Sequence, residues 1–263
     1  MAALADVEPT PAPLQLQRSA EDLRAIELVH VRAWPALETA DVQGWLWRYS
    51  GGGSQRANSV STVSFRGDDA AVALDEVEAR YRARGVLPRF HTYDLTEPAG
   101  LTDLLQARGY VEGESTITMA MPVASCEVPA DVTVADRPDA EWREVYLGAI
   151  TESRRAINAK ILPAVPSPCA WLSCRRGGQT ISSGLCVAGG ALAVIECMAT
   201  RAQARRQGGA DAVLAGIEAW AAARGVRTLA LQVVAANPPA LALYRRRGFA
   251  PVATNRFWTG TAA

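Results

Sequence analysis

One stretch of the chain, residues 193–249, fixes the order of several structural elements. It begins with the apolar run Ala193–Ala199, whose continuous hydrophobic character predicts a buried strand. A basic loop that contains glycine follows at Arg205–Ala210, and the apolar spacing after it predicts a helix. A second strand is predicted at Thr228–Val234, and a short helix from Ala240 to Arg247. The sequence therefore predicts strand, basic loop, helix, strand and helix in succession.

The composition of the basic loop suits an anion. Gly208 and Gly209 carry no Cβ, so a phosphate can approach their backbone closely. The first turn of a helix has unpaired N–H groups and a partial positive charge, which contribute roughly 0.3–1 kcal/mol per exposed anionic group. Arg205 and Arg206 can add charge-assisted hydrogen bonds. Two glycines before a helix are a weak signal by themselves, so an ordinary helix start is the alternative interpretation.

Two motifs in this stretch resemble the GNAT superfamily of N-acetyltransferases, which move an acyl group from acyl-coenzyme A to an amine. The pyrophosphate loop of that family is Arg or Gln, two residues of any type, Gly, one of any type, and then Gly or Ala. Arg205, Gly208 and Ala210 fill these places. The later element of the family, loosely Asn–Pro–x–Ala–x–x–Leu–Tyr–x–x–x–Gly–Phe, is met by Asn237, Pro238, Ala240, Leu243, Tyr244, Gly248 and Phe249. The resemblance covers roughly residues 130–260.

The resemblance implies a GNAT acyltransferase fold of the α/β class, with a mixed sheet and acetyl-CoA as cosubstrate. It implies that the coenzyme is contacted by Met198, Thr200, Arg205, Arg206, Gln207, Gly208, Gly209, Ala210, Asn237 and Ala240. It also implies that Tyr244 gives a proton to the leaving thiolate. A tyrosine hydroxyl with a pKa of about 10 can protonate a thiolate whose conjugate thiol has a pKa of about 8.5. The alternative for Tyr244 is an aromatic ring packed beneath a helix.

Glu196 is the candidate general base. An amine with a lysine-like pKa of about 10.4 is protonated at pH 7, and removing its proton costs roughly 4–5 kcal/mol. Glu196 lies within an apolar strand, and burial would raise the pKa of its carboxyl toward a useful range. A glutamate on a strand face that pairs with an arginine is an equally supported interpretation.

The first half of the chain repeats the order of elements of the second half. A helix at Asp69–Ala83, a strand at Arg89–Leu95 and a short helix closed by Gly109 have counterparts about 140 residues later. In place of the basic loop the first half has Asp68 and Asp69, and two carboxylates at a helix N-terminus would repel a pyrophosphate. We interpret the chain as two tandem copies of the fold, of which the first is degenerate.

This interpretation divides the chain into four parts. They are a flexible N-terminal arm at 1–18, a degenerate GNAT-like domain at 19–121, a linker at 122–131 and a catalytic GNAT domain at 132–263. We expect the first domain to bind no coenzyme and to cover the acceptor cleft. Its polar segment Arg56–Ser59 faces either that cleft or solvent, as in a surface hairpin. Gly51–Gly53 predicts a hairpin turn, because it joins two strand-like runs, Gly44–Tyr49 and Ser59–Ser64, and opens no helix.

Composition narrows the classes of function. The chain has 27 basic and 27 acidic residues, and a net charge of zero argues against nucleic acid as a partner, including a charged tRNA donor. Five cysteines without paired spacing and two histidines predict neither a disulfide framework nor a metal site. No apolar run of about 20 residues or basic N-terminal segment is present, so we expect a cytoplasmic protein without a membrane partner.

Together these observations predict an N-acetyltransferase that acts on the primary amine of a small molecule. A non-catalytic acyl-CoA-binding sensor is the alternative function, and a homodimer is left open. The sequence does not identify the acceptor amine.

Overall fold

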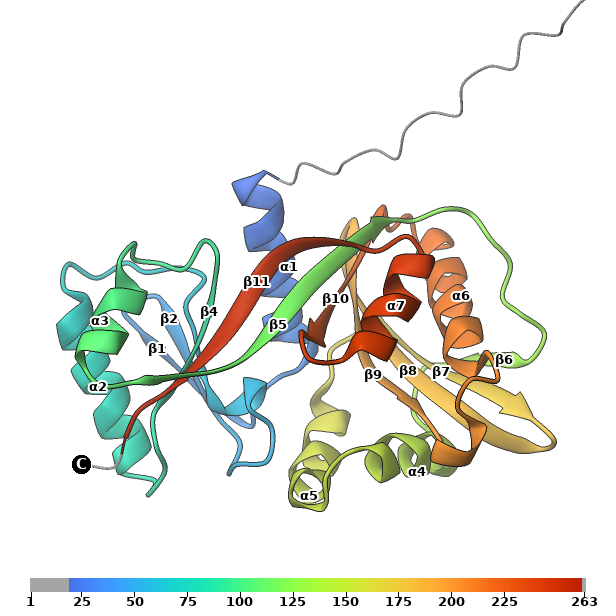
Figure 1. Ribbon diagram of the computed structural model, residues 1–263, viewed down its shortest axis with the longest axis horizontal. Helices are drawn as coiled ribbons and strands as arrows, with labels where there is room; N and C mark the ends of the chain where they lie inside the picture. The colour runs from blue at the N-terminus through green and yellow to red at the C-terminus, as the bar shows by residue number, and fades with distance from the viewer. Residues whose placement is uncertain (1–18, 262–263) are drawn as a thin grey trace, which may run out of the picture.

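The computed structural model describes residues 19–261, and the predicted N-terminal arm at 1–18 lies outside them (Figure 1). The helices are α1 (Ala20–Ala33), α2 (Ala70–Arg82), α3 (Leu101–Ala107), α4 (Ala140–Ala149), α5 (Glu152–Ile161), α6 (Gly209–Ala222) and α7 (Pro238–Arg246). The strands are β1 (Glu38–Val42), β2 (Trp45–Tyr49), β3 (Val60–Ser61), β4 (Arg89–Tyr93), β5 (Val111–Pro122), β6 (Val132–Ala135), β7 (Cys169–Arg176), β8 (Gln179–Gly189), β9 (Leu192–Thr200), β10 (Thr228–Val234) and β11 (Ala250–Thr259).

The elements predicted for the central stretch are confirmed. The apolar run forms β9, the basic loop leads into α6, and β10 and α7 follow in the predicted order. The first half has the same order of helix, strand, helix and strand in α2, β4, α3 and β5. A common order of elements is what a duplication would leave, and two tandem copies remain our proposal.

All described strands belong to one mixed sheet, in the order β1-β2-β3-β4-β11-β5-β10-β9-β8-β7-β6. The last strand of each half pairs with a strand of the other half. β5 ends the first half in sequence but pairs with β10, whereas β11 ends the chain but pairs with β4. β5 and β11 also pair with each other and run diagonally between the two halves (Figure 1). Neither half therefore holds a complete sheet of its own.

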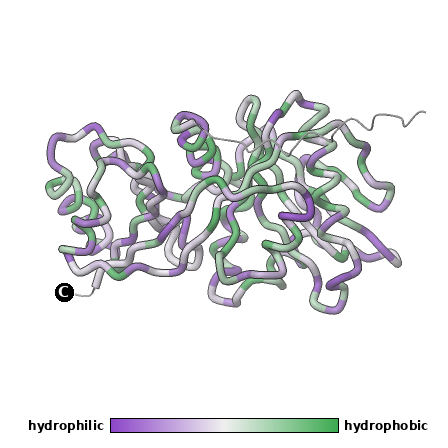
Figure 2. The backbone as a smooth tube through the Cα atoms, turned by 45° about the horizontal axis from the view of Figure 1, so that its top comes forward, coloured by the Kyte–Doolittle hydropathy of each residue, from purple (hydrophilic) through white to green (hydrophobic). Residues whose placement is uncertain are grey.

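Helices cover both faces of the sheet in the second half. On one face, α6 and α7 pack on the strands through Val213, Ile217, Leu241 and Tyr244. On the other face, α1, α4 and α5 contribute Ile26, Trp142, Val145 and Ile161 to a separate core cluster. A third cluster lies under α2 and α3 in the first half. Hydrophobic residues follow the central strands and hydrophilic residues gather in the outer turns (Figure 2).

Helix α1 belongs to the first half in sequence but packs on the second half of the sheet. Its N-cap is Ser19, whose hydroxyl accepts a hydrogen bond from the backbone N–H of Asp22 at 3.1 Å. A Cβ added to Gly189 of β8 would lie 2.9 Å from a methyl carbon of Val29, so helix and strand are in close contact. The boundary predicted between residues 121 and 132 therefore does not separate two independent cores.

Candidate active site

Strands β9 and β10 are parallel neighbours that separate partway along their length. Their pairing ends at Ile195 and Leu231, although both strands continue. Just past that point β9 carries a bulge, in which Cys197 and Met198 both lie opposite Gly184 of β8. Cys197 has a φ of 54°, a left-handed conformation that is strained for a residue with a Cβ. The bulge accompanies the opening of the sheet between the two strands.

Close packing around the bulge depends on glycine. A Cβ on Gly184 would lie 2.7 Å from the sulfur of Met198 and 2.7 Å from a methyl carbon of Val213 in α6. On the opposite face, the indole Nε1 of Trp142 donates a hydrogen bond to the carbonyl oxygen of Gly184 at 3.1 Å. Helices on both faces thus hold the bulge in place.

A cavity of about 440 Å³ opens where the strands separate. This volume lies in the range of about 300–1,000 Å³ that is typical of small-molecule sites. The cavity is lined from the second half by β9, β10, β11, α4, α5 and α7, and from the first half by β5 and the loop Gly53–Arg56. The residues of the predicted site that line it are Glu196, Met198, Asn237, Ala240 and Tyr244. Thr200 and the loop Arg205–Ala210 lie outside this lining.

Glu196 forms a buried ion pair at this cavity. Its side chain is 4% exposed, and the guanidinium of Arg56 donates to both carboxylate oxygens, with Nη1 2.6 Å from Oε1. The Nδ1 atom of His30 in α1 lies 3.2 Å from Oε1 of the same carboxylate. The interpretation of Glu196 as a strand-face glutamate paired with an arginine is confirmed.

Asn58 organises the loop that carries Arg56. Its Oδ1 accepts hydrogen bonds from the backbone N–H groups of Ser50 and Gly52, and its Nδ2 donates to the carbonyl oxygens of Gly52 and Ser54. The loop also packs on α5, since a Cβ on Gly53 would lie 3.3 Å from the Cα of Arg154. Gly51–Gly53 thus lies between the antiparallel strands β2 and β3, as predicted, in a long loop that is held against the second half. Of the polar segment Arg56–Ser59, Arg56 lines the cavity.

The pKa of the Glu196 carboxyl is lowered to about 2, which is the opposite of the predicted direction. Burial by itself raises this pKa, but the charge of Arg56 and the hydrogen bonds from His30 and Arg56 outweigh it. The prediction of a raised pKa is wrong because the apolar neighbours of Glu196 in sequence do not reveal partners from distant segments. A carboxylate with so low a pKa binds a proton weakly, so Glu196 lacks the property expected of a general base.

Replacing Glu196 by Gln should destabilise the protein by about 3–5 kcal/mol, because the guanidinium of Arg56 loses its counter-ion in a buried site. The melting temperature should fall by about 10 °C, which thermal unfolding followed by circular dichroism would measure. The pKa of Glu196 in the folded state lies below its ordinary value of 4.5. The stability that the ionised carboxylate contributes is therefore fully present above about pH 4.5 and is lost as pH falls toward 2.

The melting difference between wild type and Glu196→Gln should thus be constant above about pH 5 and should shrink below it. Glu112→Gln is the matched control, because Glu112 forms an exposed pair with Arg256 at 3.0 Å and should change stability little. A difference that keeps its full size down to about pH 3 would contradict the lowered pKa.

Tyr244 lies on α7 and faces the same cavity. The residue is 8% exposed, and its ring meets the ring of Phe249 edge to face, with centroids 5.9 Å apart. Burial, followed by the charge of Glu196, raises the pKa of Tyr244 to about 12, so the hydroxyl keeps its proton at neutral pH. This hydroxyl makes no hydrogen bond within residues 19–261. It is therefore free to donate to a ligand in the cavity.

Asn237 and Ala240 fix the start of the helix that carries Tyr244. Oδ1 of Asn237 accepts a hydrogen bond from the backbone N–H of Ala240 at 3.3 Å and caps α7. Both residues also line the cavity. Thr200 contacts β8 instead, since its hydroxyl lies 2.7 Å from the hydroxyl of Ser182.

The basic loop ends at the N-terminus of α6. Gly208 is the N-cap and has a φ of 78°, a conformation that favours glycine. Gly209 has a different role, because a Cβ there would lie 2.6 Å from the hydroxyl oxygen of Ser182. The backbone N–H groups of Gln207 and Gly208 donate to no residue within 19–261. Arg205 and Arg206 are exposed beside them, so the loop can receive an anion.

Arg176 is a residue of this region that sequence reasoning missed. Its Nη1 donates to the carbonyl oxygen of Gln207, and its Nη2 lies 2.8 Å from the carboxylate of Asp131. Arg176 is on β7 and carries no local motif that would connect it with a loop thirty residues later. The guanidinium holds the basic loop by its backbone.

The corresponding helix of the first half offers no such anion site. The carboxylate of Asp69 accepts a hydrogen bond from the backbone N–H of Ala71 at 2.7 Å and caps α2. An acidic side chain thus occupies the position that a phosphate would take. This observation supports our proposal that the first half binds no coenzyme.

No group of three His, Cys, Asp or Glu side chains within residues 19–261 is arranged to hold a metal ion. None of the helices in this part of the chain is long and apolar enough to span a membrane.

Comparisons with known proteins agree with this geometry. The family model described as Probable histone acetyltransferase Rv0428c C-terminal matches residues 20–258. The Uncharacterized N-acetyltransferase YobR of Bacillus subtilis is 25% identical over 256 residues, which are 90% of this chain and 98% of the relative.

Solved structures show the same fold at low sequence identity. A GCN5-related N-acetyltransferase from Kribbella flavida has a TM-score of 0.69 and 17% identity, over 91% of this chain and 96% of that one. A Tandem GNAT protein from the clavulanic acid biosynthesis pathway has a TM-score of 0.58 and 12% identity, over 94% of this chain and 91% of that one. The family model matches nearly the whole described chain, and the similar proteins are N-acetyltransferases. This protein therefore belongs to the Rv0428c C-terminal family and is an enzyme of the GNAT N-acetyltransferase type.

Proposed function

We propose that this enzyme transfers an acetyl group from acetyl-CoA to the primary amine of a small molecule, by direct attack of the amine on the thioester. One observation carries the proposal. The opening between β9 and β10 brings the Tyr244 hydroxyl and the bulged backbone of β9 to one cavity, and the anion-receiving loop lies beyond the end of β9. These are the parts that acetyl transfer from a coenzyme thioester needs.

The residues present fit the coenzyme. Acetyl-CoA supplies the activated acetyl group when it is bound. A Cβ on Gly208 would lie 3.9 Å from the guanidinium of Arg176, so the glycine leaves room for an anion between this cation and the N-terminus of α6. The free N–H groups of Gln207 and Gly208 suit the pyrophosphate. We assign Arg205, Arg206, Gly209 and Ala210 to the same subsite. Met198 and Thr200 of β9, with Asn237 and Ala240 at the start of α7, would border the pantetheine arm.

The chemical step needs two proton transfers from nitrogen. The ammonium group of the acceptor first gives one proton to water in the cavity. The neutral nitrogen then attacks the thioester carbon, so that a C–N bond forms and the C–S bond breaks. Tyr244 donates its proton to the departing sulfur and regains one from the nitrogen, which leaves an amide and a free thiol. One ammonium and one thioester thus give one amide, one thiol and one proton in solution.

Glu196 has a positioning role in this scheme. Its carboxylate stays ionised and holds Arg56 at the cavity wall, since Arg56 donates to both of its oxygens. The low pKa of that carboxyl makes it a poor final proton acceptor, so in this scheme water relays the first proton of the ammonium to the solvent.

A small acceptor suits the charges of the cavity better than a basic protein tail does. The family description names a probable histone acetyltransferase, and a histone tail would bring several lysines to the site. Two arginines and two glutamates line the cavity, namely Arg56, Arg154, Glu114 and Glu196. A wall without excess negative charge gives a tail with several lysines no net electrostatic attraction.

Release of free thiol from acetyl-CoA in the presence of primary amines tests the proposal. Thiol release that depends on the amine and yields its N-acetyl derivative is the expected result. Binding of acetyl-CoA without transfer to any amine would favour the non-catalytic sensor instead.

Gly208→Val should weaken acetyl-CoA binding about tenfold or more, because a branched side chain strains a positive φ and fills the space of a phosphate. Calorimetry of the wild type should give one site per chain. Gly225→Val is the matched control, since Gly225 has a φ of 72° and open surroundings but lies at the far end of α6. Two equal sites per chain, or equal affinities in both variants, would argue against this loop as the coenzyme site.

A further inference from the structure

The charged side chains of the cavity wall fall into two groups. Arg56 and Glu196 neutralise each other within their ion pair. Glu114 and Arg154 also line the cavity, but the side chain of neither forms a hydrogen bond or an ion pair with another residue of 19–261. The cavity thus presents one negative and one positive group whose charges no protein partner satisfies.

The remaining titratable groups of the wall are neutral. Burial raises the pKa of the Tyr146 hydroxyl and of the Cys197 thiol far above neutral pH. These groups keep their protons and cannot balance a charged ligand. A charged acceptor must therefore be recognised through Glu114 and Arg154.

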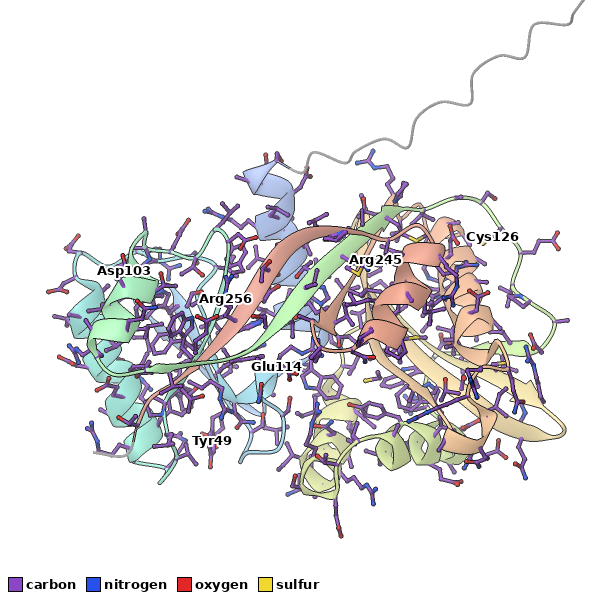
Figure 3. The ribbon with its side chains drawn as sticks, in the orientation of Figure 1. Tyr49, Asp103, Glu114, Cys126, Arg245 and Arg256 are labelled. Atoms are coloured by element: carbon purple, nitrogen blue, oxygen red, sulfur yellow. The ribbon has the colours of Figure 1, made fainter. Side chains whose placement is uncertain are left out.

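Glu114 lies on a wall that also offers neutral acceptor atoms. It is on β5, just beyond the residue at which the pairing of β5 with β10 ends, and it lies between the two halves of the molecule (Figure 3). Thr116 is two residues along the same strand. The Thr116 hydroxyl and Oε1 of Gln232 are buried without a partner, and both residues line the cavity.

The side chain of Gln232 is held in one orientation. Its Nε2 donates to both carboxylate oxygens of Glu27, at 3.1 and 3.2 Å. A carboxylate accepts and does not donate, so the amide nitrogen of Gln232 must face Glu27 and its oxygen must face away. An ammonium group has three donors, and Glu114, Thr116 and Gln232 offer three acceptors.

Arg154, on α5, supplies the positively charged group of the cavity wall. The loop of the first half packs on its backbone at Gly53, which fixes the segment that carries the guanidinium. A guanidinium binds a carboxylate through two parallel hydrogen bonds. The wall thus offers an ammonium subsite on β5 and a carboxylate subsite on α5.

We propose that the acceptor is a small zwitterion of the amino-acid class, whose ammonium group is received by Glu114 and whose carboxylate is received by Arg154. This inference rests on the proposed function, because it names the acceptor of that reaction. Glu114 and Arg154 determine specificity, and Tyr244 remains the residue that serves the leaving sulfur.

A matched set of acceptors tests the inference. The probes are the twenty standard amino acids and the amines that their decarboxylation gives, each assayed for thiol release at a fixed acetyl-CoA concentration. At least one amino acid should be acetylated, with a kcat/KM about tenfold or more above that of its decarboxylated partner. The inference would be overturned if decarboxylated amines or lysine-containing peptides reacted as well as the best amino acid. It would also be overturned if no amino acid reacted.

Single substitutions then test the ammonium subsite and the carboxylate subsite separately. With the best amino acid, Glu114→Gln and Arg154→Gln should each lower kcat/KM about 10- to 100-fold, the usual effect of losing a charge-assisted hydrogen bond. With its decarboxylated partner, Arg154→Gln should change kcat/KM less than about threefold, because no carboxylate is present. An equal loss with both acceptors would refute a carboxylate subsite at Arg154.

Neighbouring residues provide the controls. Glu112 lies two residues before Glu114 and Arg155 follows Arg154, and neither lines the cavity. Glu112→Gln and Arg155→Gln should leave kcat/KM unchanged, both with the best amino acid and with its decarboxylated partner. Acetyl-CoA affinity, measured by calorimetry, should be the same in all four variants. If the wild type binds no acetyl-CoA and acetylates no amine, the proposed function itself fails; if it acetylates only amines without a carboxylate, the acceptor class alone fails.

Discussion

Residues 122–263, produced without the first half, should not fold and should release no thiol from acetyl-CoA. The reason is the crossed position of β5, which lies between β10 and β11 in the full chain. Without β5, every residue of β10 from Thr228 to Val234 loses a partner on one side, and β11 loses both neighbours. The fragment also exposes the sheet face that α1 covers through Ile26 and Ala33.

Circular dichroism and size-exclusion chromatography would measure the loss of folding. The matched control is the full chain cut once by a protease in the segment 123–131, which follows β5. This cut leaves all strands present, so the two pieces should stay associated and active. A soluble and fully active 122–263 fragment would contradict the interdependence of the halves. It would also remove the proposed role of the first half in covering the acceptor cleft.

Replacing Tyr244 by Phe should lower turnover about 100- to 10,000-fold, the usual range for the loss of a general acid. The change keeps the ring that packs on Phe249 and deletes the hydroxyl that faces the cavity. Acetyl-CoA affinity should stay within about twofold of wild type, because the hydroxyl acts mainly as the thiolate develops. Single-turnover kinetics with acetyl-CoA and an accepted amine would measure the chemical step directly.

Tyr110→Phe is the matched control for Tyr244. The Tyr110 hydroxyl is hydrogen-bonded to Glu78 at 3.2 Å in the first half, away from the cavity, and turnover should not change. The pKa of Tyr244 is about 12, so its ionisation should not limit turnover below about pH 11. Wild-type turnover in Tyr244→Phe, with chemistry limiting, would show that the proton reaches sulfur from water.

The sequence predicted the elements whose signals are local. The apolar run of β9, the glycine at the start of α6 and the motif around Tyr244 were each readable in a few consecutive residues, and all three elements are present. Strand β1 was not predicted because Glu38–Val42 is largely polar and lies at the sheet edge. The run Ser59–Ser64 was expected to form a full strand but contributes only Val60–Ser61 to β3, and a helical turn at Arg56–Asn58 comes just before it.

Features that depend on contacts between distant segments could not be predicted from the sequence. The pKa of Glu196 is set by Arg56 and His30, which lie more than a hundred residues away. The crossing of β5 and β11 leaves no local trace either, since each strand has the same composition whichever neighbour it pairs with. The free charges of Glu114 and Arg154 become meaningful only when the cavity brings their segments together.

A crystal structure with bound acetyl-CoA would show directly whether the opening between β9 and β10 receives the thioester. We expect one coenzyme per chain, with its pyrophosphate on the backbone of Gln207–Ala210 and its thioester in that opening. The thioester sulfur should lie within hydrogen-bonding distance of the Tyr244 hydroxyl. A coenzyme bound at α2 in the first half, or a thioester that lies away from Tyr244, would contradict this expectation.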